Sequence, residues 1–254
     1  MMIKYLALIP ARYASTRFPA KPLADILGKP MIQHVYERAA RLFEHCYVAT
    51  DDTRIADAVK AFGGNVVMTS TEHRSGTDRC REALEKVSAE TGLAFDVVVN
   101  IQGDEPYIQT EQLELIKSCF ADSDTQIATL VKPFSSDEDI FNPNLPKVVL
   151  NARNEALYFS RSPIPYLRNL PQEEWQGAHT YLKHIGLYAY KSDILKEITA
   201  LEAGELEKLE SLEQLRWLEN GYKIKVAKTE FESYAIDTPE DLERLLEVLK
   251  RNAI

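Results

Sequence analysis

Short apolar segments alternate with amphipathic segments along the first half of the chain. Apolar runs of strand length lie at 5–9, 46–49, 65–68, 95–101 and 127–131. Between them, apolar side chains recur at the spacing of one helix face, as at Met31, Val35 and Ala39. The helices expected from this spacing lie at 31–43, 55–62, 81–91 and 113–120. Because strands that alternate with helices form right-handed βαβ units, the pattern predicts an α/β fold with a mostly parallel, doubly wound sheet.

The second half departs from this alternation. Apolar stretches at 147–150 and 156–159 flank a polar turn and predict a β-hairpin. The proline-rich segment that follows, through Gln176, is expected to be irregular. The elements expected next are a strand at 185–190, helices near 192–203 and 209–219, and a strand at 224–227. We therefore expect a single domain, residues 1–254, that carries an insertion at about 147–190.

The final helix is expected to begin at a complete start signal. Thr238 has the position of an N-cap, Pro239 would be the first helical residue, and Asp241 lies three residues after the cap. A threonine at the cap with an acidic side chain three positions later forms a capping box.

Composition and charge exclude several classes of protein. The chain has 254 residues, 45% of them hydrophobic, and a net charge of −9, which argues against nucleic acid as a partner because such binding usually needs a basic face. No apolar run approaches the ~18 residues of a transmembrane helix, so we expect no membrane association. Cys46, Cys80 and Cys119 lie far apart and match neither a disulfide framework nor a zinc site, so a cytoplasmic location is expected.

The loop after the first strand, residues 9–23, is a candidate binding site. It contains three cations and two hydroxyls, which are Arg12, Arg17, Lys21, Ser15 and Thr16. In open α/β sheets, ligands bind outside the carboxyl ends of the strands, and arginine and lysine are suited to a polyphosphate. The loop is neither a Walker A motif nor a GxGxxG motif, and a solvated basic loop is the alternative interpretation.

Two aspartates form a candidate metal site. Asp104 follows the strand expected at 95–101, and the preceding Gly103 would let the backbone turn or approach a ligand closely. Asp237 lies just before the final helix. Two carboxylates can hold Mg²⁺, which commonly uses one or two protein carboxylates together with phosphate oxygens. The alternative for Asp237 is a role in the helix-start signal alone.

Motifs in the same order resemble those of sugar-activating nucleotidyltransferases, most closely the 3-deoxy-manno-octulosonate (Kdo) cytidylyltransferases. The matching segments are IPARYASTRFPAKPL, GKPMI, ATD, SGTDR, NIQGDEP, ALYFSR, KHIG, LEQLR and DTPEDL. They extend along the whole chain. One departure lies in the first loop, where the family usually has Leu-Pro-Gly-Lys and this chain has Phe18-Pro-Ala20-Lys21. Alanine disfavours a positive φ, which glycine adopts readily.

The resemblance implies a Mg²⁺-dependent transfer of CMP from CTP to Kdo, for bacterial lipopolysaccharide synthesis. It also implies a homodimer, with 147–190 as the interface. The alternatives are a cytidylyltransferase for 8-amino-Kdo, sialic acid or another 2-keto sugar acid, and a noncatalytic nucleotide-sugar sensor.

The resemblance also assigns residues to each role. The implied catalytic residues are Arg12, Lys21, Asp104 and Asp237, of which the two aspartates bind the metal. The implied nucleotide-binding residues are Ala11, Arg12, Lys21, Ser75, Gly76, Arg79 and Gln102. The implied sugar-binding residues are Arg17, Gln102, Arg161, His184, Tyr188, Glu213 and Gln214. Plainer roles remain open: a helix cap for Ser75, a strand-start residue for His184, and a solvated helix face for Glu213 and Gln214.

Overall fold

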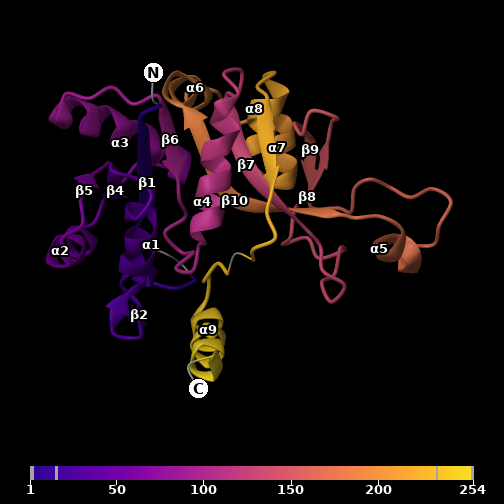
Figure 1. Ribbon diagram of the computed structural model, residues 1–254, viewed down its shortest axis with the longest axis horizontal. Helices are drawn as coiled ribbons and strands as arrows, with labels where there is room; N and C mark the ends of the chain where they lie inside the picture. The colour runs from indigo at the N-terminus through magenta and orange to yellow at the C-terminus, as the bar shows by residue number, and fades with distance from the viewer. Residues whose placement is uncertain (1–2, 15–16, 233, 253–254) are drawn as a thin grey trace. The chain divides into compact units, whose positions relative to one another are not determined.

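The computed structural model describes residues 3–14, 17–232 and 234–252. The chain divides into two compact units, most of whose helices and strands are labelled in Figure 1. The first comprises Met1–Leu113 with Ser233–Ile254, and the second comprises Glu114–Glu232. The insertion expected at 147–190 lies within the second unit, and the single-domain organisation stays a prediction.

The first unit contains a parallel sheet whose strands are in the order β6-β1-β4-β5. These strands are β1 (Tyr5–Ala11), β4 (Cys46–Thr50), β5 (Val66–Met68) and β6 (Val97–Asn100). The helices between them are α1 (Met31–Ala40), α2 (Thr53–Ala61) and α3 (Gly76–Thr91). A short hairpin of β2 (Asp25–Ile26) and β3 (Lys29–Pro30) precedes α1. All four residues of β6 are buried, as expected for a parallel strand covered on both faces. The predicted α/β fold is confirmed.

Strands β1 and β6 place two functional loops side by side. Leu8 pairs with Asn100, and the Ile101 N–H donates to the Leu8 carbonyl at 2.9 Å. The chain therefore leaves both strands at the same edge of the sheet. Gly103 is required there because a Cβ atom at this position would lie 2.8 Å from the Pro10 carbonyl oxygen. The close approach predicted at Gly103 is thus made to the neighbouring loop.

The C-terminal segment returns to the first unit. The Ile236 N–H donates to the Asp104 carbonyl at 2.9 Å, and α9 (Pro239–Asn252) follows. Ile236 and Leu245 are buried with Ile26 and Met31 in one apolar cluster. The capping box is confirmed, as shown by the contacts Asp241 N–H to Thr238 Oγ1, 3.3 Å, and Thr238 N–H to Asp241 Oδ2, 3.0 Å.

The second unit has a mixed sheet with β7 (Ile127–Pro133) at its centre. Strand β11 (Ile224–Lys228) pairs with β7 in parallel, and β10 (Leu182–Lys191) pairs with it antiparallel. The predicted hairpin is confirmed as β8 (Lys147–Leu150) and β9 (Ala156–Ser160). The helical elements of this unit are η2 (Cys119–Ala121), η3 (Gln172–Glu174), α5 (Trp175–Ala178), α6 (Ser192–Ile198), α7 (Glu205–Glu210) and α8 (Gln214–Glu219). Helix α4 (Thr110–Ser118) contains the boundary between the units.

Several sequence-based boundaries need correction, and the helix expected near 192–203, for example, ends at Ile198. The helix expected at 209–219 is divided into α7 and α8 because Ser211 has a left-handed backbone conformation, with φ of 51°. The helix expected at 81–91 begins earlier, at Gly76, because Ser75 caps it.

A projecting segment contains α5 and extends away from the strands of its own unit (Figure 1). Trp175 and Tyr181 are buried together with Ile140, so Trp175 has a packing role. Among the described residues, no helix has the length and apolarity that crossing a membrane requires.

Candidate active site

A cavity of about 300 Å³ lies in the first unit, at the carboxyl ends of β1 and β6. It collects the predicted residues of the first unit, which are Ala11, Arg12, Arg17, Lys21, Ser75, Gly76, Arg79, Gln102, Asp104 and Asp237. Sequence reasoning missed His73 and Arg74, which also line the cavity; their position directly before Ser75 was the available signal. Five arginine and lysine side chains face two carboxylates, so the cavity is suited to an anion.

Hydrogen bonds and a stacked pair fix the loop after β1. The Ala20 N–H donates to the Tyr13 carbonyl at 3.1 Å, and the Lys21 N–H donates to the Phe18 carbonyl at 3.2 Å. The Arg54 guanidinium lies 3.3 Å from the centre of the Tyr13 ring. The predicted hydroxyl ligands of this loop, Ser15 and Thr16, lie outside the described residues. The Ala24 N–H donates to the Lys21 carbonyl at 3.0 Å, so the backbone around Lys21 is held on both sides.

The Lys21 ammonium contacts both aspartates of the candidate metal site. Its Nζ lies 2.7 Å from Asp104 Oδ2 and 3.2 Å from Asp237 Oδ1. The Arg17 guanidinium contacts the other oxygen, Asp237 Oδ2, at 3.2 Å. The structure thus brings together two carboxylates that are far apart in the sequence. No group of three or more His, Cys, Asp or Glu side chains in the described part of the chain could hold a metal, so a metal here would rely on these two.

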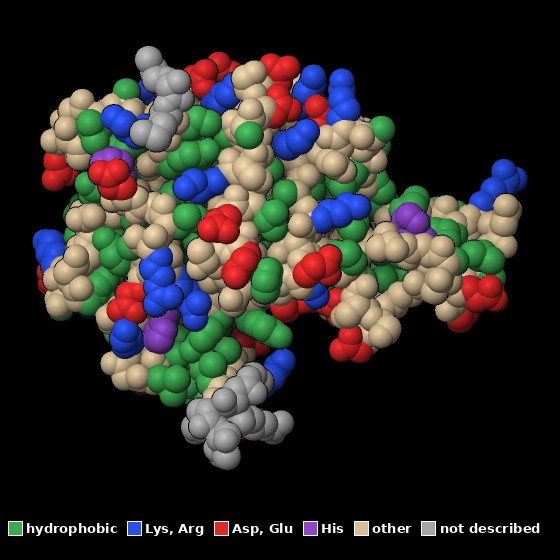
Figure 2. Space-filling view, viewed as in Figure 1, with side chains coloured by type: hydrophobic (Ala, Val, Ile, Leu, Met, Phe, Trp, Pro, Cys, Tyr) green, Lys and Arg blue, Asp and Glu red, His purple; other side chains and the backbone are tan. Residues whose placement is uncertain are grey.

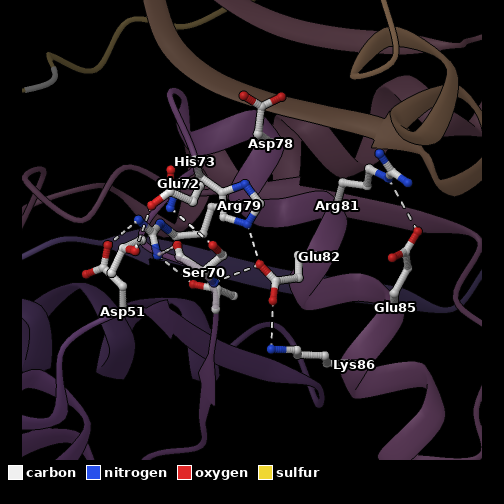
Figure 3. A network of polar contacts seen from close by, with 12 residues as sticks. Asp51, Ser70, Glu72, His73, Asp78, Arg79, Arg81, Glu82, Glu85 and Lys86 are labelled. Carbon is white, nitrogen blue, oxygen red and sulfur yellow. Dashed lines mark hydrogen bonds and ion pairs between the residues drawn. The ribbon is translucent and has the colours of Figure 1, made fainter.

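The loop before α3 is held by Arg79. This buried guanidinium contacts Asp51 Oδ2 at 2.7 Å, Thr69 Oγ1 at 2.5 Å and the Ser70 carbonyl at 3.4 Å (Figure 3). Ser75 accepts a hydrogen bond from the Asp78 N–H at 3.1 Å, which confirms its cap role. Arg79 therefore supports the wall of the cavity, and its contact with nucleotide stays a prediction.

A second group of polar contacts fixes His73. Its Nε2 pairs with Glu82 Oε2, and the Lys86 ammonium contacts Glu82 Oε1 at 2.7 Å (Figure 3). Burial raises the pKa of Glu82, but the hydrogen bonds from Lys86, the Ser70 N–H and His73 outweigh it and lower the pKa to about 2. Glu82 is therefore a carboxylate at neutral pH and holds the His73 ring at the cavity.

Arg161 lies in the second unit and contacts backbone carbonyls. Its Nε, Nη1 and Nη2 donate to the carbonyls of Glu210, Pro143 and Ser211 at 2.6, 2.8 and 3.2 Å. Since a guanidinium has five N–H donors, two donate to no acceptor in the described part of the chain. The guanidinium is oriented by the loop at Ser211, and its predicted role with the sugar carboxylate is not tested by these contacts.

His184 and Tyr188 also lie in the second unit, among aromatic rings. The rings of Tyr188 and Trp217 are 5.2 Å apart, and those of His184 and Tyr188 are also 5.2 Å apart. Burial lowers the pKa of His184 to about 4 and raises that of Tyr188 well above 10, so both are neutral at pH 7. Trp217 is 1% exposed and packs against Tyr188.

Two adjacent residues at the start of α8 differ in their surroundings. Gln214 is only 5% exposed, so a solvated face is wrong for this residue. Its Nε2 has no hydrogen-bond partner among the described residues. Glu213 pairs with Arg216 at 3.0 Å. A buried, unpartnered amide is costly unless a ligand satisfies it, which is compatible with the predicted contact to a sugar.

Comparison with known proteins identifies the family. The cytidylyltransferase family model matches residues 6–224. The chain belongs to the cytidylyltransferase family. Among its relatives, the 3-deoxy-manno-octulosonate cytidylyltransferase of Parabacteroides distasonis is 64% identical over 252 residues, 98% of this chain and 99% of the relative. The enzyme of the same name from Porphyromonas gingivalis is 53% identical, over 98% of each chain.

A solved structure of the family has the same fold. It is a CMP:2-keto-3-deoxy-manno-octonic acid synthetase complexed with CTP, and it is 43% identical with a TM-score of 0.88. The alignment covers 98% of this cytidylyltransferase chain and 99% of the other. The family and fold inferred from the sequence motifs are confirmed.

Proposed function

We propose that this cytidylyltransferase transfers CMP from CTP to Kdo and releases pyrophosphate. The observation that carries the proposal is the cavity at the ends of β1 and β6, where Arg12, Arg17 and Lys21 lie beside a pair of aspartates. The relatives named above, which match nearly the whole chain, support Kdo as the acceptor. The solved relative binds CTP.

The residues present fit a bound Mg²⁺. Asp104 and Asp237 both contact one cation, the Lys21 ammonium, so their oxygens lie close enough together to bind a single positive charge. Mg²⁺ prefers hard oxygen ligands and usually keeps several from water and phosphate, which agrees with a site of two carboxylates. When bound, Mg²⁺ would neutralise the α-phosphate and favour deprotonation of the attacking sugar hydroxyl.

The protein contributes mainly position and charge. Arg12 and Lys21 neutralise the triphosphate, most strongly as pyrophosphate leaves, because charge builds up on the leaving group. The backbone N–H groups at the start of α3, at Ser75 and Gly76, provide donors to the nucleotide, and Gln102 lies beside them in the cavity. The anomeric hydroxyl of the sugar attacks the α-phosphorus in line, and no covalent enzyme intermediate is needed.

The second unit supplies the sugar-binding groups. Within residues 3–14, 17–232 and 234–252, two N–H donors of Arg161 and the amide nitrogen of Gln214 have no partner, so Arg161 can bind the sugar carboxylate and Gln214 a hydroxyl. His184 and Tyr188 are neutral at pH 7, as is appropriate for partners of a polyol. Glu213 accepts a further hydroxyl hydrogen bond.

We further propose that the enzyme works in the bacterial cytoplasm as a homodimer, in lipopolysaccharide synthesis. Exposed apolar side chains on the segment 147–190, such as Tyr166 at 70% and Leu157 at 58%, support an interface there. Apolar surface is visible on the projecting segment in the space-filling view (Figure 2). Light scattering coupled to size-exclusion chromatography tests the dimer.

The decisive experiment measures pyrophosphate release. CTP is combined with Kdo, 8-amino-Kdo or sialic acid, and ATP, GTP and TTP serve as nucleotide controls. We expect turnover with CTP and Kdo that EDTA abolishes and excess Mg²⁺ restores. Equal or faster turnover of 8-amino-Kdo would move the assignment to the amino sugar. No release with any acceptor would favour a nucleotide-sugar sensor.

A further inference from the structure

The Lys21 ammonium contacts the oxygens that a metal at Asp104 and Asp237 would need. Its contacts at 2.7 and 3.2 Å join one oxygen of each carboxylate. The Lys21 side chain is 14% exposed, and those of Asp104 and Asp237 are 28% and 42% exposed, so the ammonium is partly shielded from water while the carboxylates remain accessible to a cation. A divalent cation that coordinates the same oxygens must displace the ammonium.

The structure allows the ammonium to move without its backbone. Lys21 begins the short 3-10 helix Lys21–Leu23, and its N–H is bonded to the Phe18 carbonyl. The lysine side chain has a flexible four-carbon stem and a compact charge. Arg12 lies in the same cavity but forms no ion pair with either aspartate in the described residues. Phosphate oxygens bound in this cavity would therefore offer Lys21 an alternative anionic partner.

We propose that Lys21 competes with the divalent cation for Asp104 and Asp237, and that CTP relieves this competition. The proposal rests on the proposed function, which places the metal at these aspartates. The triphosphate draws the Lys21 ammonium away from the carboxylates, and the metal then takes their oxygens. Metal and nucleotide consequently bind with positive coupling, and the coupling is carried by one side chain. Lys21 thus holds the two carboxylates together until the nucleotide arrives, and Arg17 balances part of the charge on Asp237.

The test measures binding of Mn²⁺ alone, in the absence of nucleotide. The electron paramagnetic resonance signal of free Mn²⁺ reports how much metal is bound by the wild type, Lys21→Met, Lys21→Arg and Arg12→Met. Lys21→Met should bind Mn²⁺ about tenfold more tightly than the wild type, which is within the usual range of coupling between two ligands. Lys21→Arg, which keeps the competing charge, should stay close to the wild type.

Arg12→Met is the matched control. It removes the same charge from the same cavity but no contact with the aspartates, so we expect it to change the Mn²⁺ affinity far less than Lys21→Met. Equal tightening by both variants would show a general effect of charge and overturn the competition. Unchanged affinity in Lys21→Met would also overturn it.

A further variant separates this inference from the proposed function. Adding Asp104→Asn to Lys21→Met should abolish the gained Mn²⁺ binding. If it does not, the metal is bound elsewhere, and the metal site of the proposed function fails together with the inference. If Asp104→Asn weakens Mn²⁺ binding of the wild type while Lys21→Met fails to tighten it, the metal site stands and only the competition is wrong.

Discussion

Ala20 has a backbone conformation that alanine rarely adopts. Its φ of 58° and ψ of 19° lie in the left-handed region, where a Cβ atom costs roughly 1–2 kcal/mol. The loop keeps this conformation because the Ala20 N–H is bonded to the Tyr13 carbonyl and Lys21 follows directly in a short helix. Ala20, at the position where the family that the motifs resemble usually has glycine, therefore has a strained backbone. Lys21 still contacts both aspartates.

Ala20→Gly should stabilise the protein. Removal of the Cβ relieves the strain, and the greater freedom of glycine in the unfolded chain offsets part of the gain. We expect the free energy of unfolding to rise by about 0.5–1 kcal/mol, measured by denaturant titration. Ala24→Gly is the control, because Ala24 has a φ of −59° and should lose stability. A less stable Ala20→Gly variant would contradict the strain argument.

Asp104 and Asp237 should behave as one unit in catalysis. Replacing either with Asn removes a negative charge but keeps the size of the side chain, so kcat should fall by orders of magnitude. The double variant should be little worse than the worse single variant, because both serve one ion. Pyrophosphate-release kinetics, with thermal unfolding as the check on folding, measure this. If the double variant lost kcat by the product of the two single losses, or if Asp237→Asn were nearly as active as the wild type, Asp237 would not bind the metal. Its role would then be limited to the start signal of α9.

At the scale of elements, the start of α9 positions a functional residue. Asp241 Oδ2 accepts hydrogen bonds from the N–H groups of Thr238 and Asp237, at 3.0 and 3.1 Å. The same carboxylate therefore caps the helix and holds the backbone of Asp237. The Ile236 N–H is meanwhile bonded to the Asp104 carbonyl. A helix cap and a pairing between loops together place the second aspartate.

Thr238→Ala should affect both stability and metal use. Loss of the cap costs about 1 kcal/mol, and the backbone of Asp237 is held less firmly, so the Mg²⁺ concentration for half-maximal activity should rise. Thr91→Ala is the control: it removes a threonine hydroxyl bonded to the Val87 carbonyl at the far end of α3. We expect it to lower stability without a change in the Mg²⁺ requirement. If Thr91→Ala raised the Mg²⁺ requirement as much as Thr238→Ala does, the effect would come from lower stability, and the cap would have no specific role at the metal site.

At the scale of the whole molecule, each unit contains a group that makes stability depend on pH. Burial lowers the pKa of His184 from 6.5 to about 4. The unfolded chain then binds a proton that the folded chain does not, so stability is lost as the pH falls from about 6.5 to 4. Glu82, with its pKa lowered from 4.5 to about 2, loses its contribution between about 4.5 and 2. The pH ranges in which the two groups lower the stability therefore overlap only slightly.

His184→Gln should remove the pH dependence of stability that lies between about pH 6.5 and 4. Between pH 7 and pH 5, the wild type should lose about 2 kcal/mol more of its free energy of unfolding than the variant. Denaturant titrations at the two pH values measure this difference. Glu82→Gln is the control and should leave the change between pH 7 and pH 5 as in the wild type. An equal loss in the wild type and His184→Gln would show that His184 is not the responsible group.

Local chemistry made much of the fold predictable. The apolar run at 95–101 became the buried strand β6, and the cap residues Thr238, Pro239 and Asp241 formed the expected helix start. These features depend on neighbours within a few residues, where propensity and hydrogen bonding are visible in the sequence. The division of the helix at 209–219 was not visible, because the left-handed conformation of Ser211 accompanies contacts between its loop and Arg161.

The α/β fold, the basic loop and the candidate carboxylates follow from patterns in the amino-acid sequence. The contacts of Asp104 and Asp237 with the Lys21 ammonium, the support of the cavity wall by Arg79, and the place of His73 in its lining depend on how the chain folds. The physical reason is distance along the chain. Strand pairing places Leu8 beside Asn100, and the contact between the Ile236 N–H and the Asp104 carbonyl joins segments more than a hundred residues apart. No local pattern encodes which charged groups then meet.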